Sequence, residues 1–280
     1  MEHGNALGDF LRARRELVRP ADVGLAPGHG LRRVPGLRRE EVALLAGISA
    51  EYYLRLEQGR DRSPSAQVAS ALARVLRLDA DATAHLLALA APPPRRTGRS
   101  AQDTVPPGIG LLIEGLNVPA FVINRYHDIL AVNPPARRLT PLVTPGVNWL
   151  RVHFAEPSAR VHAPEWERGA AAMVAHLRAQ AGTDPSDARL QSLISELSQA
   201  STLFRELWDR HEVHRGHGSS TVIRHPVLGD LHLMAEKFAI VGSDGLEAVL
   251  MHAAPGSPSA EALARLLSAE AEAEALAVTP

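Results

Sequence analysis

The chain has 280 residues, of which 45% are hydrophobic and 22% charged, a composition typical of a globular protein of about two domains rather than a disordered chain. It contains no cysteine, which excludes disulfide bonds, thiolate metal sites and a cysteine nucleophile. The net charge is −1, no apolar run approaches the roughly 18 residues that cross a bilayer, and residues 1–4 do not resemble a secretory signal, so we expect a cytoplasmic, soluble protein with no membrane partner.

Five short helices are predicted in the first 91 residues. The first has an apolar face from Leu7 to Leu17 with roughly helical spacing, and it ends before Pro20. The others are predicted at Leu37–Ala46, at Ala50–Glu57, from Val68 to Leu76 behind a cap offered by Ser63-Pro64-Ser65, and after Asp79. This pattern predicts a compact all-α domain over residues 1–91.

A proline-rich break separates this domain from the rest of the chain. Three prolines from Pro92 to Pro94, followed by Arg, Thr, Gly and Ser residues, predict a linker over residues 92–105. A second domain is then expected over residues 106–280, including a helix at the C-terminal end.

The second domain mixes predicted strands and helices. The strands are expected at Ala120–Asn124, Ile129–Val132, Thr221–Arg224, Leu228–Ala239 and Leu246–His252. The helices are expected after a capping Asn133 and at Trp166–Ala179, Ala188–Leu197, Ser201–His211 and Ser259–Leu276. Two strands, then helices, then three strands favour an α+β fold around one antiparallel sheet.

The stretch Arg39–Gln58 has the pattern of a helix-turn-helix. Ala43 is small where two helices would cross, Gly47 suits the turn, and Ser49 can cap the second helix. The apolar residues expected to face inward are Val42, Ala46, Tyr53 and Leu56. This arrangement matters because the first helix must brace the second before the second can enter a major groove. The alternative is a plain helical hairpin whose arginines only increase solubility.

The charge distribution favours the DNA-binding interpretation. Residues 1–100 contain 16 arginines against 11 acidic residues, whereas the remaining 180 contain 14 basic and 20 acidic residues. Polar side chains on the outer face of the second helix can contact base edges, and arginines at the start of the first can contact phosphates. The predicted DNA-contacting residues are Arg38, Arg39, Ser49, Ala50, Glu51, Tyr52, Arg55 and Arg60. Because such domains usually bind as symmetric pairs, we expect a homodimer on double-stranded DNA.

These motifs resemble a known family. The runs Arg33–Ala43, Ala46–Ser49 and Tyr52–Gly59 are similar to XRE-type helix-turn-helix regulators that carry an MmyB-like ligand-binding domain. A second block of similarity comprises Asn133, Ala136, Phe154, Trp166, Leu177, Arg178, Leu193–Ser198, Phe204, Trp208 and His225–Gly229. The resemblance implies a λ-repressor-like domain joined to a PAS-like sensor domain that binds a small lipophilic, fatty-acid-like ligand and controls transcription. Arg39 and Ala50 stand where the wider class often has glutamine, so no operator sequence is carried over.

The second domain holds most of the aromatic residues, which can line an apolar pocket with a few polar groups. The predicted ligand-contacting residues are Phe121, Trp149, Phe154, Trp166, Met173, Arg178, Phe204, Trp208 and His225. Of these, Arg178 and His225 can hold a carboxylate or carbonyl. One alternative is ordinary core packing. Another is that the domain binds no ligand and serves only dimerisation or protein partners. Apart from such a ligand, no cofactor is expected.

Metal and catalytic sites are weakly indicated. His211, His214 and His217, next to Glu212, have a spacing that can hold zinc or nickel, but a solvated loop is favoured there and no metal is expected. The chain lacks Gly-x-Ser-x-Gly, GxxxxGK[ST] and GxGxxG motifs, so no catalytic residues are assigned and we do not expect an enzyme. An enzyme or a protein-interaction adaptor remain the rival classes.

Overall fold

A computed structural model describes residues 5–25, 36–91, 104–156, 166–181, 187–214, 218–243 and 245–278. The chain divides into two compact units. The first unit comprises residues 1–95, 174–195 and 205–215, and the second comprises 96–173, 196–204 and 216–280. The predicted linker over residues 92–105 lies almost wholly outside the described residues.

The N-terminal part of the first unit is all-α, as predicted. Its elements are α1 (Ala6–Leu17), the 3₁₀ helix η1 (Pro20–Val23), α2 (Arg39–Ala46), α3 (Ala50–Glu57), α4 (Ala66–Val75) and α5 (Ala80–Ala90). Side chains of Ser49, Ser65 and Asp79 accept hydrogen bonds from backbone N–H groups in the first turns of α3, α4 and α5. The five predicted helices are confirmed, and η1 was not predicted.

The core of the first unit holds large apolar side chains that are fully buried, among them Phe10, Leu11, Tyr53, Leu56 and Leu72. Helix α1 contacts α3 and α5, while α2 contacts α3 and α4. Burial of this many aromatic and aliphatic side chains supplies the main favourable term for folding the unit. The position of α3 is therefore set by the core rather than by its surface contacts.

Three further helices follow in the C-terminal half of the sequence: α10 (Trp166–Ala181), α11 (Ala188–Ala200) and α12 (Thr202–Asp209). Each has part of its length in the first unit. Ala179 in α10 and Val213 after α12 are buried in the same core cluster as Phe10 and Leu56. The first unit is thus completed by residues that lie far from its N-terminal helices in the sequence.

The second unit is built on one five-stranded antiparallel sheet in the order β2-β1-β5-β4-β3. The strands are β1 (Ala120–Ile123), β2 (Ile129–Val132), β3 (Ser219–His225), β4 (Gly229–Ala239) and β5 (Glu247–His252). In the register, Phe121 of β1 pairs with Val249 of β5, and Ala235 of β4 pairs with Met251. All five predicted strands are present, so the predicted α+β fold is confirmed.

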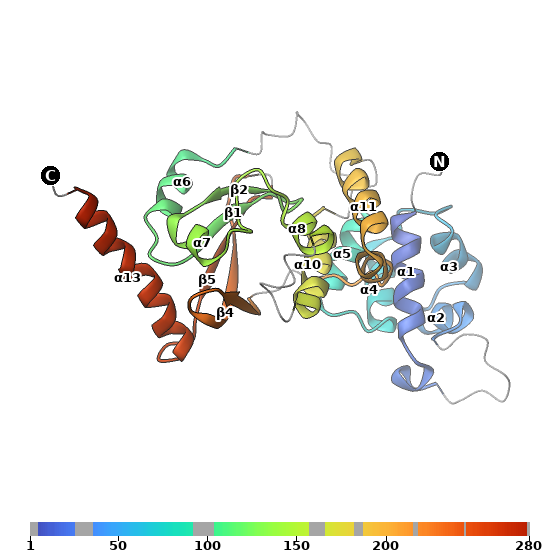
Figure 1. Ribbon diagram of the computed structural model, residues 1–280. Coiled ribbons are helices and arrows are strands. Elements are labelled where there is room, and N and C mark those ends of the chain that lie inside the picture. Colours follow the sequence, from blue (N-terminus) through green and yellow to red (C-terminus); the bar gives the residue numbers. More distant parts are fainter. Residues whose placement is uncertain are drawn as a thin grey trace. The chain divides into compact units, whose positions relative to one another are not determined.

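Helices cover both faces of this sheet (Figure 1). They are α6 (Pro107–Glu114), α7 (Pro134–Leu139) and α13 (Pro258–Val278), while α8 (Trp149–Ala155) packs its first residue against the same core. Ile113 of α6 packs against Ala120 and Val122 on one face. On the other face, residues of α7 and α13, including Leu139 and Leu263, pack against the strands.

Asn133 fixes the start of α7 and is fully buried. Its Oδ1 accepts from the backbone N–H groups of Ala120 (2.9 Å) and Ala136 (3.0 Å). Its Nδ2 lies within hydrogen-bond distance of the carbonyls of Ile113, Leu116 and Val118, the last at 2.8 Å. The predicted cap therefore also joins α6 to the sheet.

Two helices of the second unit were not predicted, α6 and α8. Helix α6 begins at Pro107 and includes Gly108 and Gly110, residues with low helix propensity, so its sequence does not indicate a helix. Packing of Ile113 against the sheet stabilises this helix in place of a favourable local helix propensity. Among the described residues, no helix combines the length and apolar character needed to cross a membrane.

Candidate nucleic-acid interface and ligand site

The turn between α2 and α3 is formed as the sequence predicts. Gly47 ends α2 with φ +69°, the left-handed region that glycine adopts at little cost, and nothing lies within 4 Å of the position that a Cβ would take. The Oγ of Ser49 then accepts from the backbone N–H of Tyr52 at 3.1 Å. Ala43 is buried in α2. These residues hold two short helices in a helix-turn-helix.

A buried ion-pair hub fixes the inner face of α3. The Glu57 side chain is fully buried and accepts hydrogen bonds from Nε of Arg15 and Nε of Arg39, each at 2.6 Å. Arg15, also buried, donates from Nη1 to the carbonyl of Leu37 at 2.9 Å. Burial alone would raise the pKa of Glu57, but the hydrogen bonds from the two arginines outweigh it, so its pKa is lowered. We call Arg15, Arg39 and Glu57 the hub. The hub joins α1, the start of α2 and the end of α3.

Neither Arg15 nor Glu57 was singled out from the sequence. Glu57 stands four residues after Tyr53, so the helical spacing places its carboxylate on the same buried face of the helix. A carboxylate on a buried face requires a basic partner, and this was the signal available in the sequence. Arg39, predicted as a phosphate contact, uses its Nε on Glu57. Its side chain remains 44% exposed, which leaves the rest of the guanidinium accessible.

The outer face of α3 carries a small cluster of polar side chains. Nη1 of Arg55 lies 3.3 Å from Oε1 of Glu51, and the Arg55 guanidinium lies 5.5 Å from the centre of the Tyr52 ring. Burial, and next the charge of Asp61, raise the pKa of Tyr52, so its hydroxyl remains a hydrogen-bond donor at neutral pH. Such a set can donate to and accept from base edges or phosphates.

The other predicted DNA-contacting residues flank this cluster. Ser49 and Ala50 are exposed at the start of α3, Arg38 is exposed at the start of α2, and Arg60 is exposed just after α3. The backbone N–H of Arg38 donates to Glu41 at 2.7 Å, which shapes the first turn of α2. Among the eight predicted residues, Arg39 is the one whose partner in the described part of the chain is the buried Glu57.

In the second unit, four predicted ligand-contacting aromatic residues form a continuous row. The ring centres of Phe121 and Trp149 are 6.0 Å apart, and those of Phe154 and Phe204 are 5.1 Å apart. His153 joins the two pairs, at 5.7 Å from Trp149 and 6.2 Å from Phe154. We call these five residues the aromatic row. They bring together a strand, α8 and the start of α12.

His153 was not predicted, because α8 itself was not predicted. Burial lowers its pKa to about 4, although a hydrogen bond with the backbone of Trp166 acts in the opposite direction, so the imidazole is neutral at pH 7. Its Nε2 is buried and has no hydrogen-bond partner among the described residues. Gly169 of α10 lies beside this atom, because a Cβ at position 169 would be 3.8 Å from Nε2.

Comparison with known proteins identifies both regions. Residues 105–267 match the family model of the MmyB-like transcription regulator ligand binding domain, and residues 6–86 match that of a helix-turn-helix domain. The chain belongs to the MmyB-like transcription regulators. It is a DNA-binding helix-turn-helix regulator with a domain of a ligand-binding family, and neither matched family is a family of enzymes. A comparison with curated proteins gave no match.

The regulator does not bring all predicted ligand-contacting residues to the aromatic row. Trp166 and Met173 are half-buried on the part of α10 that belongs to the second unit. Arg178 and Trp208 belong to the first unit, where the Arg178 guanidinium lies 3.8 Å from the centre of the Trp208 ring. This guanidinium is therefore engaged within the first unit.

His225 of the regulator has both ring nitrogens engaged by backbone groups. Its Nδ1 accepts from the N–H groups of Val227 and Leu228, each at 3.2 Å. Because Nδ1 accepts, Nε2 carries the proton and donates to the Arg138 carbonyl at 3.3 Å. The side chain thus holds the turn between β3 and β4.

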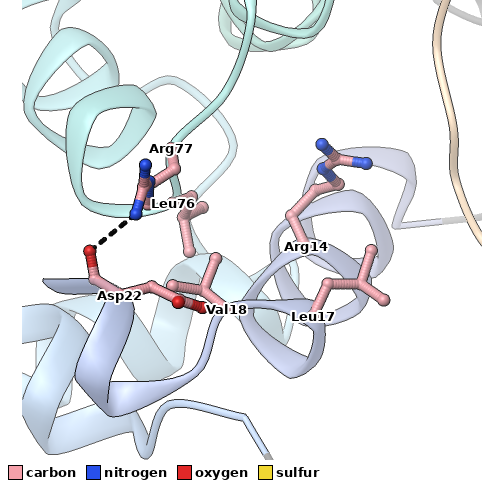
Figure 2. A pocket seen from close by; sticks show the side chains of 6 residues that line it. All are labelled: Arg14, Leu17, Val18, Asp22, Leu76 and Arg77. Atoms are coloured by element: carbon pink, nitrogen blue, oxygen red, sulfur yellow. Dashed lines mark hydrogen bonds between the residues drawn. The ribbon is translucent and has the colours of Figure 1, made fainter.

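A hollow in the first unit of the regulator was not predicted (Figure 2). It has a volume of about 400 Å³ and is lined by Arg14, Leu17, Val18, Asp22, Leu76 and Arg77. Arg77 donates from Nη1 to the Asp22 carbonyl at 2.8 Å. None of the lining residues belongs to the predicted DNA-contacting or ligand-contacting sets. Among the described residues there is no cluster of side chains that could hold a metal ion, and His217 of the histidine triplet lies outside them.

Proposed function

We propose that the regulator binds duplex DNA sequence-specifically, with α3 in the major groove. The observation that carries this proposal is the accessible cluster of Glu51, Tyr52 and Arg55 on a helix whose opposite face is held by the buried hub. A helix fixed in this way presents its side chains without a large loss of entropy on binding. Arg55 can pair with a guanine edge, and Glu51 can accept from cytosine.

Phosphate contacts would come from the residues around α3. Arg38 and Arg60 are exposed, and the accessible part of Arg39 can add a third contact while its Nε stays on Glu57. The first backbone N–H groups of α2 favour an anion at the same place. We expect the protein to bind as a homodimer, with two copies of α3 in half-sites about one helical turn apart.

A small lipophilic, fatty-acid-like molecule is the proposed ligand, bound at the aromatic row. The rings offer apolar contacts, and Trp166 and Met173 on α10 are the further candidates to contact it. His153 is neutral, and its Nε2 faces no partner among the described residues. Since the hydrogen bond to the Trp166 backbone raises the His153 pKa, the ring donates there, and Nε2 is an acceptor. It suits a head group that donates, such as a hydroxyl or a protonated carboxylic acid.

A second candidate function is favoured by a different observation. Leu111 and Leu112 of α6 are 77% and 59% exposed, and Phe238 of β4 is 54% exposed. A contiguous apolar surface patch is typical of a protein-binding face, and these three side chains are the candidates to form one. The C-terminal domain would then serve dimerisation or a protein partner and would take no ligand.

The DNA proposal is tested by selecting a specific duplex from a random pool and measuring the affinity of variants for it. Arg55→Ala is expected to weaken the selected duplex by about 1–3 kcal/mol and to leave random DNA almost unaffected. An equal loss on both would make Arg55 a phosphate contact. Arg151→Ala, which breaks an exposed ion pair with Glu196 in the second unit, is the matched control and should change neither affinity.

The ligand proposal is tested by extracting the purified protein and analysing the extract by mass spectrometry. A lipophilic molecule present in proportion to the protein supports it. An empty extract from a dimeric protein that binds DNA favours the second candidate. A DNA-binding regulator must be in the same compartment as the DNA. The cytoplasmic location of this protein stays a prediction.

A further inference from the structure

The first unit contains more than the helix-turn-helix domain. Residues 174–195 and 205–215 belong to it, although both segments fall inside the 105–267 match to the ligand-binding domain. Ala179 and Val213 from these segments are buried in the core that also holds Phe10 of α1 and Leu86 of α5. Part of the sequence assigned to ligand binding therefore packs with helices that support DNA binding.

Arg178 holds these two segments together. The residue is buried, with only 5% of its surface exposed. Its Nη2 donates to the Trp208 carbonyl, its Nη1 lies 3.2 Å from Nδ1 of His211, and its guanidinium stacks on the Trp208 ring. A buried cation that loses its hydrogen-bond and stacking partners is left uncompensated, which costs free energy. The interactions of Arg178 with Trp208 and His211 therefore favour this one arrangement of the two segments.

Two carboxylates act electrostatically on Arg178, and one of them belongs to α1. Burial lowers the pKa of Arg178 to about 10, opposed by the carboxylates of Asp209 and Asp9, so the guanidinium remains charged at neutral pH. Asp9 lies in the first turn of α1. Burial, and next the charge of Arg178, lower the pKa of His211 to about 3, so its neutral ring can accept from Arg178 at Nδ1.

A second contact joins the same segment to α5. Nδ1 of His214 lies 3.5 Å from Oδ2 of Asp81, and the backbone N–H of His214 donates to the carbonyl of Ala175 in α10 at 3.3 Å. His214 is largely exposed, so this pair adds less than the Arg178 contact. The His214–Asp81 pair thus reaches α5, while Arg178 holds residues 208–211 on α10 and is affected by the charge of Asp9 in α1. None of these residues is a predicted DNA contact.

We infer that residues 174–195 and 205–214 are a built-in partner of α1 and α5, held by Arg178, and that they carry the ligand signal to the DNA-binding helices. Helix α10 is continuous from Trp166 to Ala181, and its residues up to Met173 belong to the second unit. Its first residue interacts with His153 through the backbone, and its later part carries Arg178. A ligand that moves the start of α10 thus moves Arg178 as well. Only this last step rests on the proposed ligand site.

The packing is tested in the full chain by inserting a protease site within residues 92–103 and cutting it. The two fragments are expected to elute together on gel filtration, because the built-in partner in one fragment packs with α1 and α5 of the other. Arg178→Ala should weaken this association by about tenfold or more, and Arg178→Lys, which keeps the charge but loses the planar stacking, should have an intermediate effect. Arg151→Ala is the matched control and should leave the fragments together.

Circular dichroism before cutting shows whether each variant is folded. If Arg178→Ala fails to fold, Asp81→Asn replaces it, with a smaller expected loss of association. Separation of the wild-type fragments would overturn the inference. Equal association of the wild-type and Arg178→Ala fragments would overturn the role of Arg178.

The signalling step is tested with 1-dodecanol as the probe, because its hydroxyl can donate to Nε2 of His153. In the uncut wild type, saturating probe should change the affinity for the selected duplex, whereas Arg178→Ala should bind probe and duplex but lose the change. A variant that responds as the wild type does would refute the coupling through Arg178. If the probe does not bind the wild type, the proposed ligand class fails, and the result of the cutting experiment still decides whether the built-in partner exists.

Discussion

Replacement of Glu57 by alanine should destabilise the first unit strongly. The substitution removes two short hydrogen bonds, both at 2.6 Å, from a fully buried carboxylate. Arg15 then stays buried with the Leu37 carbonyl as its described hydrogen-bond partner, and its remaining ion pair is with the half-exposed Glu16 at 3.6 Å, which solvent screens. Breaking a buried ion pair by removing one partner costs about 3–5 kcal/mol, because the other charge is left uncompensated.

Two further variants distinguish the stability contribution of the buried Arg15 from that of the partly exposed Arg39. Arg39 is 44% exposed, so Arg39→Ala removes a contact that solvent largely replaces and should cost only about 1 kcal/mol or less. The double change of Arg15→Met with Glu57→Leu removes both buried charges and should be far less damaging than Glu57→Ala alone, since apolar pairs of similar volume often replace buried ion pairs without loss.

Hydrogen exchange of the intact chain provides the assay, because it reports the opening of α1 and α3 separately from the second unit. A loss of about 3 kcal/mol corresponds to exchange of these amides that is faster by roughly 100-fold. Helix α13 in the second unit should exchange as in the wild type. If Glu57→Ala and Arg39→Ala gave the same small increase, the hub would not hold α3, and the reasoning would be refuted.

Four other predictions concern single residues. The pKa of Glu57 is lowered in the folded state, so its contribution to stability is present above the ordinary value of 4.5 and is lost as the pH falls below it. In Glu57→Gln, stability should therefore fall less steeply with decreasing pH, as measured by hydrogen exchange. Gly47→Ala should cost about 1 kcal/mol through its φ of +69°, with Gly47→Asn costing less in denaturant titrations, and equal stabilities would contradict this explanation. Asn133→Ala should cost more than about 3 kcal/mol in thermal unfolding of the second unit, because buried backbone groups lose their partners; a wild-type melting curve would show that water replaces the side chain. His153→Phe keeps the apolar row but removes the acceptor, so the affinity for 1-dodecanol, followed by tryptophan fluorescence, should fall by about tenfold, with no change for dodecane.

Much of the fold follows from local sequence signals. Ser49, Asp79 and Asn133 each begin a helix where a capping residue is followed by suitable neighbours, and Gly47 supplies the turn that the helix-turn-helix requires. The strands were also predictable, since β-branched and apolar runs bounded by turn residues mark them. The outer face of α3 followed from the same helical period.

The features that could not be predicted from the sequence depend on contacts between residues that are far apart in the chain. Arg15 and Glu57 are 42 positions apart, and no local pattern connects them. Arg178 was predicted to hold the carboxylate or carbonyl of a ligand in an apolar pocket, yet its described partners are Trp208 and His211 in the first unit. Helix α6 is formed by packing against the sheet rather than by propensity.

The central claim is that α3, braced by the hub, enters the major groove of duplex DNA. The most direct test is the affinity of the intact protein for a selected duplex, and for the same bases in shuffled order, over a range of salt. With three arginines on phosphates in each of two protomers, the logarithm of affinity should fall with a slope of about −5 against the logarithm of salt concentration, and the selected duplex should bind more tightly by at least about 1000-fold. Equal, weak and salt-insensitive binding of both duplexes would contradict the claim.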